Sequence, residues 1–271
     1  MVSPVFSPLI ICYICPVRNR LTNELAVCGV NAALALGEFH PESINRLFLR
    51  EDRLKIFFKV CKYLAEKKYP YKICDDEELE RLCKSNRHQG VVAMIEEPAV
   101  PGAAEADLDL WAAEGKTGVV LHSVGNDHNL GAIVRAAAFF EAHFVILGGE
   151  DQEIRLSTSA YRVAEGGMEH VVFRRVRSTA AFLQAASKRI VTIGADPRAR
   201  RRIRDLGGII EERGLQRRPG IALVVGNEET GLPAEIKEQC SVLARIPGTG
   251  NIESLNVAQA AALFLHEFFE L

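Results

Sequence analysis

The second half of the chain alternates short apolar segments with helical patterns, and this alternation restricts the fold more than any other feature. Runs such as Ile221-Ala-Leu-Val-Val225 predict strands. In chain order the predicted strands lie near residues 119–122, 144–147, 170–173, 190–193, 221–225 and 243–246. Strands that are apolar on both faces, each followed by a helix, are typical of a parallel sheet covered on both sides. The sequence therefore predicts an α/β domain over residues 117–271, with ligands at the carboxyl ends of its strands.

Residues 25–97 are predicted to form a smaller α/β domain. Helical patterns over 30–39, 54–67 and 76–84 alternate with strand patterns over 46–50, 71–74 and 90–95. We interpret residues 98–116 as a linker, because the stretch from Glu96 to Asp107 is rich in Pro, Gly, Ala and acidic residues and lacks apolar periodicity.

Composition excludes several classes of protein. No apolar run reaches the roughly 20 residues that a membrane helix needs, so no membrane association is expected. The formal charge is −2, from 33 Lys and Arg against 35 Asp and Glu, so any nucleic acid must be held by local basic patches. The seven cysteines are odd in number and scattered, which favours a reducing, cytoplasmic location over a disulfide framework.

Residues 1–24 are interpreted as an irregular arm. The apolar run from Val5 to Cys15 lacks a basic leader and a small-residue cleavage site, which makes a signal peptide the weaker interpretation. Cys12 and Cys15 form a C-x-x-C, but no second pair or nearby His completes a metal site. We therefore expect two apolar residues there rather than redox chemistry, and no metal in the protein.

Three loops after predicted strands combine glycines with polar side chains. In chain order they are Ser123-Val-Gly-Asn-Asp-His-Asn-Leu-Gly-Ala-Ile-Val-Arg135, Gly226-Asn-Glu-Glu-Thr-Gly231-Leu-Pro233 and Ile246-Pro-Gly-Thr-Gly-Asn-Ile-Glu-Ser254-Leu-Asn256-Val. Glycines allow the backbone to approach a ligand closely. The last two loops lack the G-x-G-x-x-G pattern of dinucleotide sites, which disfavours a nicotinamide enzyme.

Arg135 lies about 200° around its predicted helix from the apolar Ile133 and is free to point toward the loops.

In this order, N-x-G-A-I-x-R, G-x-E-x-x-G-L and I-P-x-x-G-x-x-x-S-L-N-V resemble the three motifs of the SpoU branch of the SPOUT RNA methyltransferases. Upstream, Val27-Cys-Gly29-Val-Asn-Ala-Ala33 and His88-Gln-Gly-Val-Val92 look like the substrate-binding domain of that family. The resemblance covers residues 25–271. The layout is most similar to a tRNA/rRNA methyltransferase subgroup, with Ala164-Glu-Gly-Gly-Met-Glu169 where better-known members have a Ser-Gly-Ala-type segment.

The resemblance implies a C-terminal parallel-sheet α/β domain with a deep trefoil knot, preceded by a small α/β (L30e-like) substrate-binding domain. It also implies a homodimer with the site at the interface, and S-adenosylmethionine (AdoMet) as the cofactor. The cofactor contacts that it implies are Gly226, Gly231, Leu232, Ile246 and Leu255.

The reaction that the resemblance implies is methyl transfer from AdoMet to a ribose 2′-hydroxyl of tRNA or rRNA. Arg135 matches the arginine assigned in the family to that hydroxyl, but a guanidinium stays protonated at neutral pH and is a poor general base. We favour a role in which Arg135 stabilises developing alkoxide charge. The supporting polar residues implied by the family are Asn129, Glu228, Ser254 and Asn256. Gly248 and Ala258 depart from the usual Met and Ser, which affects the expected substrate pocket rather than the polar motif residues.

Two groups of arginines are candidates for contact with RNA phosphates. The first comprises Arg198, Arg200, Arg201, Arg202 and Arg204, and the second comprises Arg174, Arg175 and Arg177. The alternative is a solvated, charged surface. Two further functions stay open: a non-catalytic RNA-binding or ribosome-assembly protein that keeps the fold, and a SPOUT methyltransferase that acts on a base.

Overall fold

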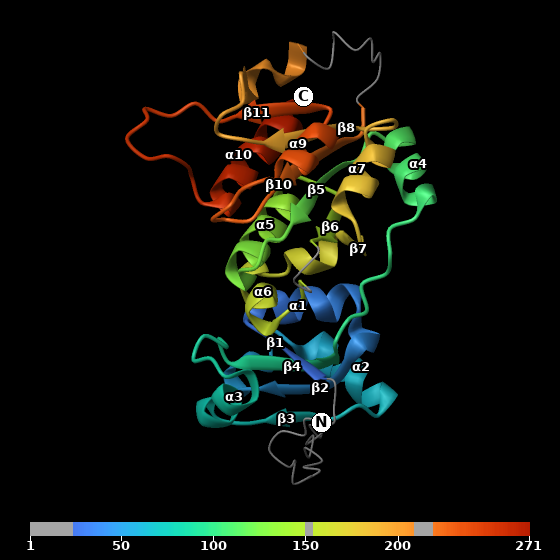
Figure 1. Cartoon of the computed structure of the whole chain (residues 1–271). Helices are drawn as coiled ribbons and strands as arrows, with labels where there is room; N and C mark the ends of the chain where they lie inside the picture. The colour runs from blue at the N-terminus through green and yellow to red at the C-terminus, as the bar shows by residue number, and fades with distance from the viewer. Residues whose placement is uncertain (1–23, 150–153, 209–218) are drawn as a thin grey trace, which may run out of the picture.

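Two α/β domains make up the part of the chain that the computed structural model describes, residues 24–149, 154–208 and 219–271 (Figure 1). The predicted arm, Cys12 and Cys15 included, lies outside these residues, except that Glu24 begins a strand. None of the helices in the described ranges combines the length and the apolar character needed to cross a membrane.

The small domain is a mixed sheet with helices. Its strands are β1 (Glu24–Cys28), β2 (Ile44–Leu49), β3 (Tyr71–Ile73) and β4 (Val91–Glu96), and its helices are α1 (Val30–Phe39), α2 (Phe58–Lys67) and α3 (Asp76–Cys83). The strand order is β1-β4-β2-β3, with β4 antiparallel to both neighbours and β2 parallel to β3. The predicted elements are confirmed, although α2 begins later than expected, and β1 is an additional strand.

The large domain contains the predicted parallel sheet. Within the described residues its strands are β5 (Thr117–His122), β6 (Phe144–Gly148), β7 (Val172–Arg175), β8 (Val191–Ala195), β9 (Arg201–Arg202), β10 (Ile221–Val225) and β11 (Val242–Arg245). They follow the order β7-β6-β5-β10-β8-β11-β9, and every neighbouring pair is parallel.

Helices cover both faces of this sheet, as the apolar strands predict. They are α4 (Glu105–Ala113), α5 (Asp127–Phe139), α6 (Thr158–Ala164), α7 (Thr179–Ala186), α9 (Ala234–Gln239) and α10 (Val257–Glu270). Val119 and Leu121 of β5 share a core with residues of α5 and α10, whereas Val120 packs into a second core with α4, α7 and α9. The alternation along β5 places the two cores on opposite faces of the sheet.

The predicted linker is wrong in one respect, because α4 occupies residues 105–113. Leu108 and Trp111 of this helix are buried, and the Trp111 ring stacks on Phe144 of β6 with centroids 3.9 Å apart. Asp107 accepts two hydrogen bonds from the Arg174 guanidinium, each 3.0 Å long. Residues 98–116 therefore include an element that packs on the large domain.

The first core of the large domain is continuous with that of the small domain, because both contribute to one cluster of buried apolar side chains. Figure 1 shows α1 of the small domain beside α6. The contact is tight: a Cβ on Gly166 would lie 2.9 Å from the Cβ of Ala35 and 3.1 Å from the carbonyl oxygen of Asn31.

Candidate active site

The sheet brings the first two motif loops together. β5 and β10 are adjacent, with Leu121 opposite Val225, so the loops after them leave the sheet at the same level. Asn227 joins them, since its Nδ2 donates to the carbonyl oxygen of Ser123 at 3.1 Å. The oxygen of the Asn227 amide accepts from the backbone N–H groups of Glu229 and Thr230, which fixes the turn of the second loop.

A chain of side-chain hydrogen bonds connects all three motifs. Asn129 Nδ2 donates to Glu228 Oε1 at 2.7 Å, and Asn256 Nδ2 donates to Asn129 Oδ1 at 3.0 Å. Asn256 also caps α10, because its Oδ1 accepts from the backbone N–H of Ala258 at 2.9 Å. Asn129, Glu228 and Asn256, which are distant in the sequence, therefore form one polar cluster.

A cavity of about 380 Å³ opens beside this cluster. The five predicted cofactor residues, Gly226, Gly231, Leu232, Ile246 and Leu255, all line it, together with Glu228 and Ser254. Its volume falls within the range of about 300–1,000 Å³ that is usual for small-molecule sites. The backbone of two glycine-containing turns, the apolar side chains of Leu232, Ile246 and Leu255, and several charged side chains line the cavity, which suits a ligand that has both apolar and polar groups.

Gly226 packs closely against its own loop. A Cβ at this position would lie 2.3 Å from the carbonyl oxygen of Gly231. The approach of its backbone to a ligand stays a prediction. The backbone of residues 226 and 231 is in close contact, and Gly231 N donates to the Asn227 carbonyl oxygen at 2.9 Å. Gly226 thus sets the shape of the loop that lines the cavity.

Sequence reasoning missed a charged pair in the cavity. Lys237 Nζ lies 2.9 Å from Asp196 Oδ2, and both residues line the cavity. Burial raises the pKa of the Asp196 carboxyl, but the hydrogen bond from Lys237, the backbone N–H of Arg198 and the nearby positive charges outweigh it and hold the pKa below its ordinary value. Asp196 follows directly after β8, and the carboxyl-end rule for parallel strands could have identified it.

Arg135 stands apart from the polar cluster. Its Nη1 lies 3.2 Å from Glu165 Oε1 at the end of α6, and Asn31 of the small domain donates to the other Glu165 oxygen at 3.3 Å. Arg135 is not among the residues that line the cavity. The hydrogen bond that the structure shows for Glu228 is to Asn129 and not to Arg135.

The two arginine groups differ. Arg198, Arg200, Arg201, Arg202 and Arg204 are exposed, β9 forms an edge of the sheet beside β11, and Arg198 also lines the cavity. In the second group, Arg174 binds Asp107 and Arg175 donates to the carbonyl oxygen of Ile154 at 2.6 Å. These two arginines hold elements of the domain together, which favours a structural role for them.

In the described ranges, no group of three or more His, Cys, Asp or Glu side chains is arranged so that it could hold a metal ion. His122, which follows the apolar part of β5, interacts with Thr179 Oγ1 at 3.1 Å through Nδ1. That contact indicates a structural role for His122.

Two family models match the chain. One, described as the SpoU rRNA Methylase family, matches residues 116–266, and the other, described as RNA 2′-O ribose methyltransferase substrate binding, matches residues 26–101.

Similar proteins match over most of the chain. The 23S rRNA (guanosine-2′-O-)-methyltransferase RlmB of Bordetella pertussis is 30% identical over 252 residues, which cover 91% of this chain and 97% of that protein. The putative TrmH family tRNA/rRNA methyltransferase YacO of Bacillus subtilis is 32% identical over 190 residues, covering 68% and 71%. The crystal structure of the SpoU methyltransferase AviRb from Streptomyces viridochromogenes in complex with AdoMet shares the fold, with a TM-score of 0.70, 22% identity and 94% of each chain covered.

Proposed function

Because the chain belongs to the SpoU rRNA methylase family, we propose that it transfers a methyl group from AdoMet to a ribose 2′-hydroxyl of rRNA. The observation that carries this proposal is the hydrogen-bonded cluster of Asn129, Glu228 and Asn256, which joins all three motifs beside the cavity. The RlmB relatives are named as methyltransferases of 23S rRNA, and this favours rRNA over tRNA as the substrate of this chain.

The residues around the cavity fit AdoMet. Leu232, Ile246 and Leu255 offer apolar contacts, and the turns at Gly226 and Gly231 place backbone groups at the cavity wall. When bound, AdoMet supplies an electrophilic methyl group on a sulfonium. Glu228 is held by Asn129, so its carboxylate keeps a fixed position at the rim of the cavity.

The chain's own residues must align the ribose hydroxyl and stabilise the charge that develops on its oxygen. Positioning supplies a large part of the barrier reduction in such a displacement. Arg135, which is exposed and paired with a single carboxylate, is assigned to the developing alkoxide, and the hydroxyl proton passes to solvent or to an RNA oxygen. Ser254 and Asn256 are assigned to orienting the ribose or bracing the loop after β11.

A homodimer and a trefoil knot complete the proposal. Support for the dimer comes from an apolar face on α5 and α10, where Phe139 is 78% exposed and Leu263 and Phe269 are about half exposed. The rings of Phe139 and Phe140 lie 5.0 Å apart, and that of His266 lies 5.7 Å from Phe140. Exposed apolar side chains of this kind favour an interaction site, and a partner that bound at Phe139 would lie beside Arg135. The knot and a cytoplasmic location rest on the family resemblance and on cysteine usage.

The test of the proposed function is calorimetry of AdoMet binding, followed by transfer of tritiated methyl groups to separated tRNA and rRNA. We expect AdoMet to bind and label to enter rRNA. AdoMet binding without any transfer would favour the non-catalytic RNA-binding alternative, and the absence of AdoMet binding would overturn the proposal.

A further inference from the structure

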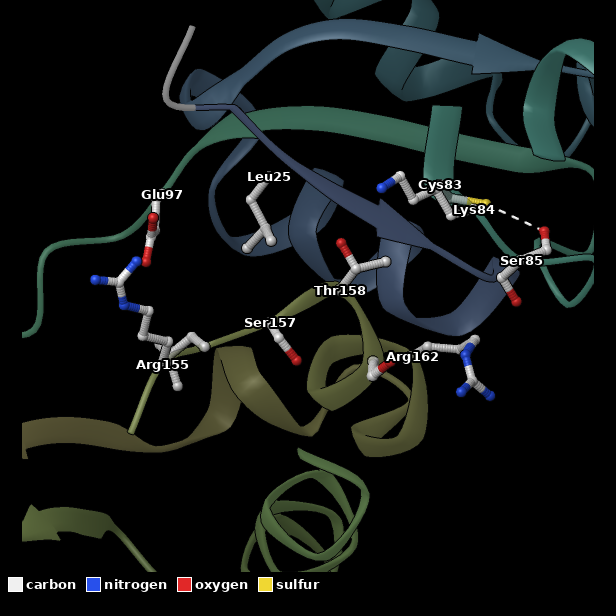
Figure 2. A pocket seen from close by; sticks show the side chains of 11 residues that line it. Leu25, Cys83, Lys84, Ser85, Glu97, Arg155, Ser157, Thr158 and Arg162 are labelled. Carbon is white, nitrogen blue, oxygen red and sulfur yellow. Dashed lines mark hydrogen bonds between the residues drawn. The ribbon is translucent and has the colours of Figure 1, made fainter. Parts of the chain in front are cut away.

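A second cavity lies between the two domains, separate from the AdoMet site. Its volume is about 550 Å³. One wall comes from the small domain, with Leu25 of β1 and residues 83–85 at the end of α3. The other wall comes from residues 155–159 and Arg162 of the large domain (Figure 2). We call this cavity the interdomain cleft. Nothing in the site described above uses it.

Charged side chains from both domains line the interdomain cleft. Figure 2 shows Glu97 and Arg155 pointing toward one another at one end, where their charges offset each other. Lys84 of the small domain and Arg162 of the large domain lie away from that pair. In Figure 2 the Lys84 ammonium is directed toward the middle of the cleft, and the Arg162 guanidinium is directed away from it on the side of Ser85. Neither Lys84 nor Arg162 forms an ion pair with another described residue. Both cationic side chains are therefore available to an anionic ligand.

The remaining lining suits a nucleotide. Thr158 and Ser159 offer hydroxyl groups with no hydrogen-bond partner among the described residues, whereas Ser157 Oγ accepts from the backbone N–H of Ala160 and so caps α6. Leu25 and Leu156 supply apolar surface against which a ribose can pack. The backbone at Ser85 is held in place, because Cys83 Sγ donates to its carbonyl oxygen at 3.3 Å.

We propose that the interdomain cleft binds the phosphate backbone of the substrate RNA, with Lys84 and Arg162 as the cations that contact it. This inference rests on the proposed function, which supplies a polyanion as substrate. Phosphate contacts fix the register of a nucleic acid without reading its sequence. A phosphate held between two domains sets the position of the RNA on the small domain relative to the catalytic loops.

The experiment measures the affinity of an unmodified 23S rRNA transcript for the full chain as a function of KCl concentration. Lys84→Ala/Arg162→Ala is compared with Lys59→Ala/Lys62→Ala, which removes the same charge from the exposed face of α2. We expect the cleft variant to bind RNA about tenfold more weakly, with a salt slope shallower by about 0.7 for each phosphate that the protein no longer neutralises. The α2 variant should keep the wild-type slope. Lys84→Arg/Arg162→Lys, which keeps both charges, should restore most of the affinity.

Two further readouts separate this inference from the proposed function. AdoMet affinity should be the same in the wild type and the cleft variant, and methyl transfer should recover when RNA is raised to saturation. If the wild type binds and methylates RNA while the cleft variant matches it in affinity and salt slope, the phosphate site is wrong and the proposed function stands. If the wild type neither binds nor methylates RNA, both fail. Inorganic phosphate at matched ionic strength should not compete with RNA, and strong competition would indicate a site for small anions instead.

Discussion

The side-chain amide of Asn129 both donates and accepts a hydrogen bond, and this accounts for an asparagine at this position of the first motif. Nδ2 donates to Glu228 of the second motif, and Oδ1 accepts from Asn256 of the third. An aspartate could accept but not donate, and a leucine could do neither. Gly131, two residues later, has a packing role, since a Cβ there would lie 2.5 Å from the carbonyl oxygen of Ala160 in α6.

Arg135→Ala is expected to abolish methyl transfer while leaving AdoMet affinity within a few-fold of the wild type. Arg135 does not line the cavity, and an exposed ion pair such as that with Glu165 contributes only about 0–1 kcal/mol to stability. Calorimetry and a transfer assay on the same preparation check both statements. Full activity in the variant would refute the assignment of Arg135 to the ribose hydroxyl.

Gly226→Ala is expected to weaken AdoMet binding at least tenfold. The new Cβ would lie 2.3 Å from the carbonyl oxygen of Gly231, so the loop that lines the cavity must move. The matched control is Gly248→Ala in the third motif loop, where a Cβ meets no atom within 4 Å. Calorimetry should show a normal AdoMet affinity for the control, and equal affinities for the two variants would contradict the account.

At the scale of elements, the sequence predicts best where the physical signal is local. Strand β10 is apolar on both faces, so its pattern alone places it inside a covered sheet. Helix α4 was not predicted, because its only large apolar residues are Leu108, Leu110 and Trp111. These stand among Ala and acidic residues and do not form a clear helical pattern. The Arg135–Glu165 pair and the bond between Arg174 and Asp107 also depend on tertiary contacts that no local pattern encodes.

Trp111→Ala tests the packing of α4. Trp111 is 4% exposed and stacks on Phe144, so its loss should lower the free energy of unfolding by about 3–5 kcal/mol. Leu110→Ala, at a neighbouring position that is 50% exposed, should change it by less than about 1 kcal/mol. Urea denaturation of both variants makes the comparison. Equal effects would mean that α4 does not pack on the sheet.

The free energy of unfolding is expected to depend on pH through Glu169, which lies in η3 (Gly167–His170) where this segment contacts α1. Burial raises the pKa of the Glu169 carboxyl, and the charge of His40, 3.8 Å away, lowers it only in part. Glu169 Oε1 has no hydrogen-bond partner among the described residues. A carboxyl with a raised pKa binds its proton more tightly when folded, so its contribution to stability is present below pH 4.5 and is lost as the pH rises through the folded pKa.

Glu169→Gln, which stays uncharged, should therefore raise the free energy of unfolding by about 1 kcal/mol near pH 8 and change it little near pH 4. Glu42→Gln removes an exposed carboxylate that faces the same histidine at 3.3 Å and should have little effect at either pH. Thermal unfolding across this pH range measures both. A loss of stability near pH 8 in Glu169→Gln would show that the ionised carboxylate is favourable in the folded protein.

At the scale of the whole molecule, a chain with a formal charge of −2 must hold RNA through separate basic surfaces. The exposed arginines at 198–204 lie around β9, which pairs with β11 at the end of the large domain farthest from the small domain (Figure 1). The interdomain cleft lies toward the other end. An RNA that reaches both would run along the large domain, which also holds the cavity proposed for AdoMet.

Replacing Arg200, Arg201 and Arg202 with Ala should weaken binding of all RNAs to a similar degree and make the salt slope shallower by about 0.7 for each phosphate left without its arginine. The ranking among RNAs should survive, because phosphate contacts carry no sequence information. Titrations of several transcripts at a series of KCl concentrations test this. An affinity and slope equal to the wild type would identify the cluster as a solvated surface.

The site could be predicted only in part at this scale. The three motif loops stand out in the sequence because glycines and polar residues follow apolar strands, and the structure brings Asn129, Glu228 and Asn256 into contact. The sequence could not show that β8 lies between β10 and β11, which places Asp196 and Lys237 in the same cavity. Strand order is a property of the assembled sheet, and it decides which loops meet.

The chemical identity of the methylated nucleoside tests the central claim most directly. Unmodified rRNA is incubated with the protein and labelled AdoMet, digested to nucleosides and analysed by mass spectrometry, with a second portion hydrolysed in alkali. We predict a 2′-O-methyl nucleoside and one phosphodiester that resists alkali, because the blocked hydroxyl can no longer attack its neighbouring phosphate. Both signals should be absent with Arg135→Ala. A methyl group on a base, with alkaline cleavage unchanged, would contradict the account.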